Sequence, residues 1–307
     1  MPNRLAVAIV HGIGNQDAHF SDGMQAKLLQ GFADRAKISR AAAEEALVFQ
    51  PVYWAPALAA REAKLWEKLS AGENLGWTAM RRFMVEFAAD AIAYQPMPSE
   101  RNVYADVHAV FADALANVVK RAGPGLPLVV IAHSLGTVIA SNYLYDLQES
   151  AKRLAAGRTD LVPKRVRERI GDTPLERGET LAWLFTMGSP IGIWSLRYEN
   201  PDFGVPIRVP APAFARSRPG IRCGWVNLYD EDDVIGYPLK GLYPDAILAD
   251  VRVNVGNLLS SWNPLSHNAY WTDGDVTDRI AGDLADFWRK LEAAGRSSRA
   301  ATQNLAR

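Results

Sequence analysis

The apolar residues of the chain fall into short runs that alternate with longer segments of helical periodicity. The runs lie at residues 5–10, 47–53, 128–132, 181–187, 224–229 and 250–255. Largely continuous apolar runs of this length are typical of strands that helices cover on both faces. Between them, apolar side chains recur three or four positions apart at 21–36, at 103–118 and from about residue 275. This order predicts an α/β fold with a mostly parallel sheet of about six strands flanked by helices.

A serine lies at the turn between the third apolar run and the helix-like segment that follows it. The chain there reads Leu128-Val-Val-Ile-Ala-His-Ser-Leu-Gly136 and continues with helical periodicity from Thr137. Small residues, Ala132 and Gly136, stand two positions before and after Ser134. A strained serine at a strand-to-helix turn, with no bulk at those flanking positions, is the pattern of a nucleophile elbow. Ser134 is therefore the predicted nucleophile.

The chain shows no internal repeat and no linker that would divide it into two units. We predict one domain over residues 1–295 and a polar, disordered tail over 296–307. Residues 57–99 are unusually rich in large apolar side chains and predict a helical, cap-like insertion that could line a lipophilic pocket. Residues 151–178 are polar and basic and predict a solvated insertion.

Composition excludes several classes of partner. Lys+Arg and Asp+Glu number 34 each, so no net charge would attract nucleic acid or an anionic membrane. The single cysteine, Cys223, excludes an internal disulfide and suits a reducing compartment. The first ten residues lack the pattern of a signal peptide, and no segment predicts an integral membrane span. We expect a cytoplasmic protein that binds neither nucleic acid nor membrane lipid through such features.

A serine nucleophile needs a histidine base and an acid that orients it. Only one histidine lies beyond residue 150: His267, between the last predicted strand and the last helix. The acid is expected after the strand at 224–229, where the chain reads Asp230-Glu-Asp-Asp-Val-Ile-Gly236. An acid followed by apolar residues favours Asp233, with Asp232 and Asp230 as alternatives.

The remaining histidines are assigned to packing. His11 and His133 flank the expected site, and proton transfer is not assigned to either. His108 falls on the polar side of its helical pattern, which predicts a surface position.

A tetrahedral intermediate also needs N–H donors for its oxyanion, and the loss of one donor typically costs ~2.7–4 kcal/mol. One donor is expected to be the amide of Leu135, directly after the nucleophile. The other is expected in the loop after the first strand, His11-Gly-Ile-Gly14, where Gly12 permits a close backbone approach. The amide of Ile13 is our candidate.

The His-Gly-x-Gly loop, the Ala-His-Ser-Leu-Gly elbow, the Asp loop and the late histidine resemble a serine esterase or lipase of the α/β-hydrolase superfamily. The arrangement is similar to that of bacterial lipases that lack the first two strands. The resemblance covers the first strand and residues 128–140, 224–236 and 264–271, and it departs from the usual Gly-x-Ser-x-Gly pattern at Ala132.

The resemblance implies hydrolysis of a small-molecule or lipid carboxylic ester through an acyl-enzyme on Ser134, with His267 as general base and Asp233 as orienting acid. This chemistry needs no cofactor and no metal ion, and none is expected. Acyl transfer or thioester hydrolysis on the same triad is an alternative, because the nucleophile does not dictate the leaving group. A non-catalytic binding protein on the same fold is a further alternative.

Overall fold

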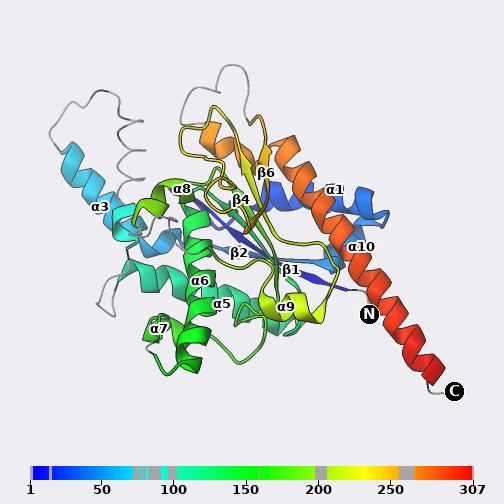
Figure 1. The fold of residues 1–307 in the computed structure, drawn as a ribbon. Helices are drawn as coiled ribbons and strands as arrows, with labels where there is room; N and C mark the ends of the chain where they lie inside the picture. The colour runs from blue at the N-terminus through cyan, green and yellow to red at the C-terminus, as the bar shows by residue number, and fades with distance from the viewer. Residues whose placement is uncertain are drawn as a thin grey trace.

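The computed structural model describes residues 3–13, 16–71, 76, 78, 81, 91–95, 102–158, 160–197, 206–255 and 266–305. In this part of the chain, six strands form a single parallel sheet in the order β2-β1-β3-β4-β5-β6 (Figure 1). The strands are β1 (Leu5–Val10), β2 (Leu47–Val52), β3 (Leu128–His133), β4 (Leu181–Met187), β5 (Trp225–Tyr229) and β6 (Ile247–Arg252). Every residue of β1, β3 and β4 is buried, which accounts for their continuous apolar sequences.

Helices cover both faces of this sheet (Figure 1). On one face α5 (Val103–Ala122) packs on β1 and β2, and α6 (Leu135–Ala155) packs on β1 and β3. On the other face α1 (Asp22–Ala36) packs against the long helix α10 (Gly274–Leu305) (Figure 1). The shorter helices are α2 (Arg40–Ala46), α3 (Ala59–Ser70), α7 (Lys164–Arg167), α8 (Ile191–Trp194) and α9 (Pro212–Ser217), with 3₁₀ turns η1 (Ala55–Ala57), η2 (Ser195–Arg197) and η3 (Ser266–Trp271).

The strand order places the topological switch point of the sheet between β1 and β3. From β1 the chain moves outward to β2, and it then returns to the other side of β1 to form β3. Connections therefore leave these two adjacent strands toward opposite faces, and open parallel sheets bind ligands at the carboxyl ends of such strands. The loop after β1 and the turn after β3 meet at this point.

The predicted fold class is confirmed as α/β: an open, six-stranded parallel sheet is flanked by helices on both faces. The predicted strand at 250–255 begins earlier, at Ile247, because β6 pairs with β5 from the register Trp225–Ile247 onward. Among the described helices, none is long and apolar enough to cross a membrane.

Two predicted segments, the tail from residue 296 and the cap-like insertion at 57–99, can be compared with the described structure. The tail predicted to be disordered from 296 is helical in the structure as far as Leu305, as a continuation of α10. Alanine, arginine and glutamine are good helix formers, and a helix already nucleated by its packed first turns extends at little cost. In the cap-like insertion at 57–99, α3 forms as expected, whereas most of the predicted second helix lies outside the described residues.

Candidate active site

Ser134 occupies the turn that joins β3 to α6, with backbone angles φ 53° and ψ −131°. A non-glycine residue with positive φ is strained, at a cost of order 1–3 kcal/mol. Its amide donates to the carbonyl of Met187 at the end of β4 at 3.0 Å, and its carbonyl accepts the Thr137 hydroxyl at 2.7 Å. These contacts hold the turn in the geometry of a nucleophile elbow.

The structure gives the steric reason for small residues around this turn. A methyl carbon on Gly136 would lie 2.3 Å from the carbonyl oxygen of His11 and 2.8 Å from that of Val10. A methyl carbon on Gly12 would lie 2.5 Å from the Cβ of Ser134. The first turn of α6 and the loop after β1 therefore touch backbone to backbone, which brings Ser134 next to that loop.

Replacing Gly136 with alanine is expected to destabilise the protein by ~1–3 kcal/mol or more, because backbone atoms on both sides of the contact would have to separate. Urea denaturation of the two proteins measures the difference. Gly125→Ala is the matched control, since no atom lies within 4 Å of the added carbon and the site is exposed. Equal stability of the Gly136→Ala and Gly125→Ala proteins would contradict this packing.

His267 and Asp233 form a buried acid–base pair. The Nδ1 of His267 lies 2.8 Å from Oδ2 of Asp233, and both side chains are only 2% exposed. A carboxylate can only accept, so the imidazole proton lies on Nδ1 and Nε2 keeps its lone pair. Burial alone would raise the pKa of the Asp233 carboxyl, but hydrogen bonds from His267 and from the Ile235 amide outweigh burial and hold it below its ordinary value.

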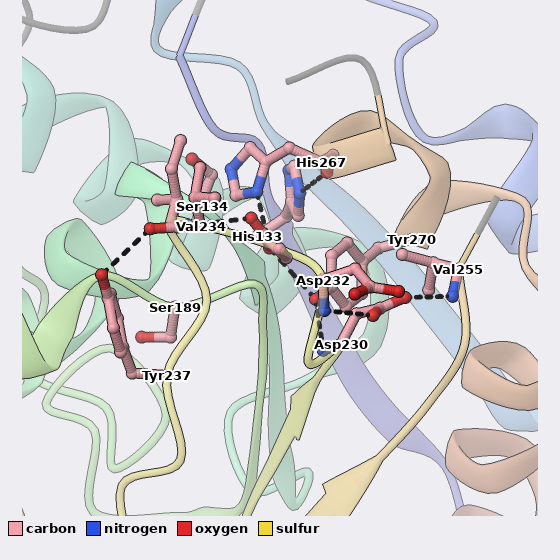
Figure 2. Close-up of polar contacts among 12 residues, drawn as sticks. His133, Ser134, Ser189, Asp230, Asp232, Val234, Tyr237, Val255, His267 and Tyr270 are labelled. Atoms are coloured by element: carbon pink, nitrogen blue, oxygen red, sulfur yellow. Dashed lines mark hydrogen bonds and ion pairs between the residues drawn. The ribbon is translucent and has the colours of Figure 1, made fainter. Parts of the chain in front are cut away.

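The three candidate aspartates have different partners. Asp233 contacts His267, as described above. The carboxylate of Asp230 accepts hydrogen bonds from the amides of Asp232 and Val255, at 2.9 and 2.6 Å (Figure 2). These bonds join the loop of residues 230–236, the acid loop, to the segment after β6. The Asp232 residue is exposed. Among the described residues, Asp233 is thus the aspartate that the structure brings to His267.

Ser134 and His267 are both drawn in Figure 2, and each of them lies close to the backbone at the end of β4. The backbone at Met187 binds the Ser134 amide, and a methyl carbon on the next residue, Gly188, would lie 3.0 Å from both His267 Cε1 and Asp233 Oδ2. Gly188 has φ 53°, a conformation that favours glycine. Within the described chain, Ser134 Oγ and His267 Nε2 are both buried without a hydrogen-bond partner. The hydrogen bond between nucleophile and base is often long until substrate binds.

His133 contacts the backbone of His267. Its Nε2 lies 2.6 Å from the carbonyl oxygen of His267, which can only accept, so Nε2 carries the proton. Burial first, and the neighbouring His267 second, lower the pKa of His133 to about 3, so the ring is neutral. His133 therefore holds the backbone of His267 and stays neutral at ordinary pH.

His11 fixes the loop that is expected to supply an oxyanion donor. Its Nε2 accepts the amides of Trp54 and Ala55 at 3.1 and 3.2 Å, so Nδ1 carries the proton and donates to the Gly12 carbonyl at 2.7 Å. Burial lowers the pKa of His11 to about 4. The His11 ring also stacks on Trp54 at 4.7 Å. The loop is thereby tied to the end of β2.

The two amides expected to form the oxyanion hole lie on either side of this contact. Leu135 is the first residue of α6, so its N–H has no acceptor within the helix. Ile13 is buried directly after Gly12, the residue that touches Ser134. The positive end of the α6 dipole adds to the field that would favour an oxyanion here. The oxyanion assignment stays a prediction.

Two residues at the site were not predicted from the sequence. Gly188 follows β4 and leaves room for the His267–Asp233 pair. Tyr270 follows His267 by three residues and donates its hydroxyl to Asp233 Oδ2 at 3.1 Å. The sequence signal for Tyr270 was its spacing from the histidine within a short helical turn.

The prediction of a surface position for His108 is wrong. The side chain is 1% exposed, and its Nε2 lies 2.7 Å from the hydroxyl of Tyr94. Tyr94 and Tyr104 pack against the ring, which fills a polar pocket between segments far apart in the chain. No group of His, Cys, Asp and Glu in the described chain could hold a metal ion.

No family profile matches the sequence, and no curated protein matches it. A solved structure of a proline iminopeptidase-related protein from Thermus thermophilus is similar to the chain, with 16% sequence identity and a TM-score of 0.31 over 94% of this chain and 91% of that chain.

Proposed function

We propose that the protein is a serine hydrolase that cleaves carboxylic esters through an acyl-enzyme on Ser134. The observation that carries this proposal is the buried His267–Asp233 hydrogen bond of 2.8 Å, in a chain that also holds a serine with strained backbone at a strand-to-helix turn. A buried imidazole whose Nδ1–H donates to a carboxylate partner has the free lone pair on Nε2 that a general base requires.

The reaction then follows from the roles of the residues. His267 Nε2 takes the proton of Ser134 as Oγ attacks the acyl carbon. Asp233 stabilises the imidazolium that forms, and the amides of Leu135 and Ile13 donate to the oxyanion. The imidazolium gives this proton to the leaving alcohol as its bond to the acyl carbon breaks. Water then attacks the acyl carbon while His267 takes one of its protons, and the imidazolium returns that proton to Ser134 Oγ as the free acid leaves.

The expectation that the ester carries an apolar acyl or alcohol group rests on an open surface pocket with a mostly apolar lining. This pocket has a volume of about 390 Å³ and is lined by Ala91, Ile92, Gln95, Ile193 and Trp194. Ile193 and Trp194 belong to α8, which follows β4 at the carboxyl edge of the sheet, and Ile92 comes from the described end of the cap-like insertion. Ile92 and Ile193 line this pocket together and are 75% and 44% exposed, so they form an apolar patch that solvent can reach.

A fluorophosphonate probe tests this proposal without knowledge of the natural substrate. We expect the wild-type protein to gain one probe, mapped by mass spectrometry to the peptide that contains Ser134, and to hydrolyse p-nitrophenyl esters. The Ser134→Ala protein should keep its fold and lose both. Ser141→Ala, on the same helix, is the matched control and should be labelled like the wild type. A folded wild-type protein that takes up no probe would favour the non-catalytic binding protein.

Acyl transfer and thioester hydrolysis use the same three residues, so labelling alone does not separate them from ester hydrolysis. Product analysis with an added alcohol acceptor makes this distinction. Release of free acid in the presence of the acceptor supports hydrolysis, and formation of a new ester supports transfer.

A further inference from the structure

We propose that Tyr270 is a positioning residue of this site, whose hydroxyl orients the Asp233 carboxylate and sets how strongly Asp233 holds the protonated form of His267. The proposal rests on the function proposed above. It concerns a residue outside the Ser-His-Asp set, which acts through Asp233 and does not touch the reacting atoms.

The local backbone directs Tyr270 and His267 to the same side. Both belong to the 3₁₀ turn η3, and residues three apart in a 3₁₀ helix lie above one another. A histidine and a tyrosine at this spacing can therefore reach one carboxylate together. Tyr270 is fully buried, and its ring contacts His133 and His267 at centroid distances of 5.6 and 6.3 Å.

The direction of the Tyr270 hydroxyl proton follows from its two partners. The amide of Asp230 lies 2.8 Å from the hydroxyl oxygen, and an N–H group can only donate (Figure 2). The single hydroxyl proton is then free to point to Asp233 Oδ2, 3.1 Å away. Burial and the neighbouring Asp233 carboxylate raise the pKa of Tyr270, so it remains a donor.

Asp233 Oδ2 thus accepts from two side chains, His267 Nδ1–H and Tyr270 O–H, while Oδ1 accepts the Ile235 amide. Each hydrogen bond to a carboxylate favours its ionised form and lowers its basicity. The tyrosine therefore keeps the carboxylate charged, and it prevents Asp233 from holding the imidazolium too strongly.

The other groups around the pair do not replace this hydroxyl. His133, from β3, is neutral and uses its proton on the His267 carbonyl. Asp230, from the end of β5, uses its carboxylate on the amides of Asp232 and Val255. Among the described side chains, Tyr270 and His267 are the two that donate to Asp233.

The test measures the second-order rate of fluorophosphonate labelling of Ser134 between pH 5 and pH 9 in the wild-type and Tyr270→Phe proteins. Without the hydroxyl, the carboxylate becomes more basic and stabilises the imidazolium more. We expect the acidic limb of the profile to move to higher pH by about half a unit to one unit. The rate on the alkaline plateau should fall ~5–20-fold, because one of the donors that orient Asp233 is lost.

Tyr143→Phe is the matched control. Tyr143 is equally buried, lies on α6 away from the acid loop, and its hydroxyl has no hydrogen-bond partner in the described chain. Its pH profile should coincide with that of the wild type. In an Asp233→Asn background, Tyr270→Phe should cause no further loss, because the hydroxyl acts through the carboxylate.

The outcomes are separable. A wild-type protein that is not labelled contradicts the proposed function. Normal labelling of the wild type, with a Tyr270→Phe profile that is lowered equally at every pH or is unchanged, overturns the role of Tyr270. A Tyr270→Phe protein that loses its fold while Tyr143→Phe keeps it would assign the hydroxyl to stability, and would also overturn the proposal.

Discussion

The Asp233→Asn protein is expected to hydrolyse esters with a kcat ~10⁴-fold below that of the wild type, as the same change does in serine proteases with this arrangement of residues. Asparagine preserves the volume of the side chain, but its amide group can donate to His267 Nδ1. The imidazole proton would then move to Nε2, the nitrogen that must accept the proton of Ser134. Steady-state kinetics with a p-nitrophenyl ester, together with circular dichroism of both proteins, measures this loss.

Matched substitutions at the neighbouring aspartates separate the three candidates. Asp232→Asn alters an exposed side chain and should leave kcat within ~3-fold of the wild type, because surface changes of this kind are nearly neutral. Asp230→Asn disturbs a carboxylate that accepts two amides, so it should lower the stability of the loop by ~1–3 kcal/mol. A loss of ~10⁴ in Asp230→Asn or Asp232→Asn, with Asp233→Asn active, would assign the acid elsewhere.

Acid is expected to destabilise the folded protein strongly between pH 7 and pH 5. Burial lowers the pKa values of His11, His108 and His133 to about 4, 3 and 3. Their ordinary value is 6.5, so the unfolded chain binds these three protons as the pH falls through 6.5 while the folded chain does not. The stability that the neutral rings contribute is fully present above pH 6.5 and is lost below it. Linkage gives a decrease of ~6 kcal/mol by pH 5, about 2 kcal/mol for each ring.

Urea denaturation at half-unit steps of pH measures this decrease. His108→Gln removes one of the three rings at a place remote from Ser134, and should lower the slope of the unfolding free energy against pH by about one proton. His19→Gln makes the same substitution at a histidine whose side chain is 81% exposed, and it is the matched control for the loss of a ring that is not buried. A wild-type stability that stays constant from pH 7 to pH 5 would contradict the burial of these rings as neutral groups.

The sheet was predictable from the sequence because burial on both faces leaves a direct mark on the residues. Leu128–His133 and Leu181–Met187 have no solvent-facing positions, so their apolar runs are continuous. The Ser134 turn was equally visible, since Gly136 has to be small where it meets the His11 carbonyl. The position of His267 followed from the order of elements, because the chain offers no other late histidine.

The acid loop was harder to predict. Asp230, Asp232 and Asp233 lie within one turn, where the direction of each side chain depends on backbone hydrogen bonds and not on periodicity. The burial of His108 could not be predicted for a different reason. Its partners, Tyr94 and Asp146, come from separate segments that only the folded chain brings together. Tyr270 needed knowledge that residues 266–271 form a 3₁₀ turn.

The positive φ of Ser134 links the stability of the fold to the reaction proposed for this site. A relaxed backbone there would recover part of the ~1–3 kcal/mol that the strained turn costs the folded state, but it would change the direction of the Ser134 hydroxyl. Substitutions meant to stabilise the protein should therefore be made at positions remote from this turn, since a gain in stability at the turn itself would act against the proposed activity.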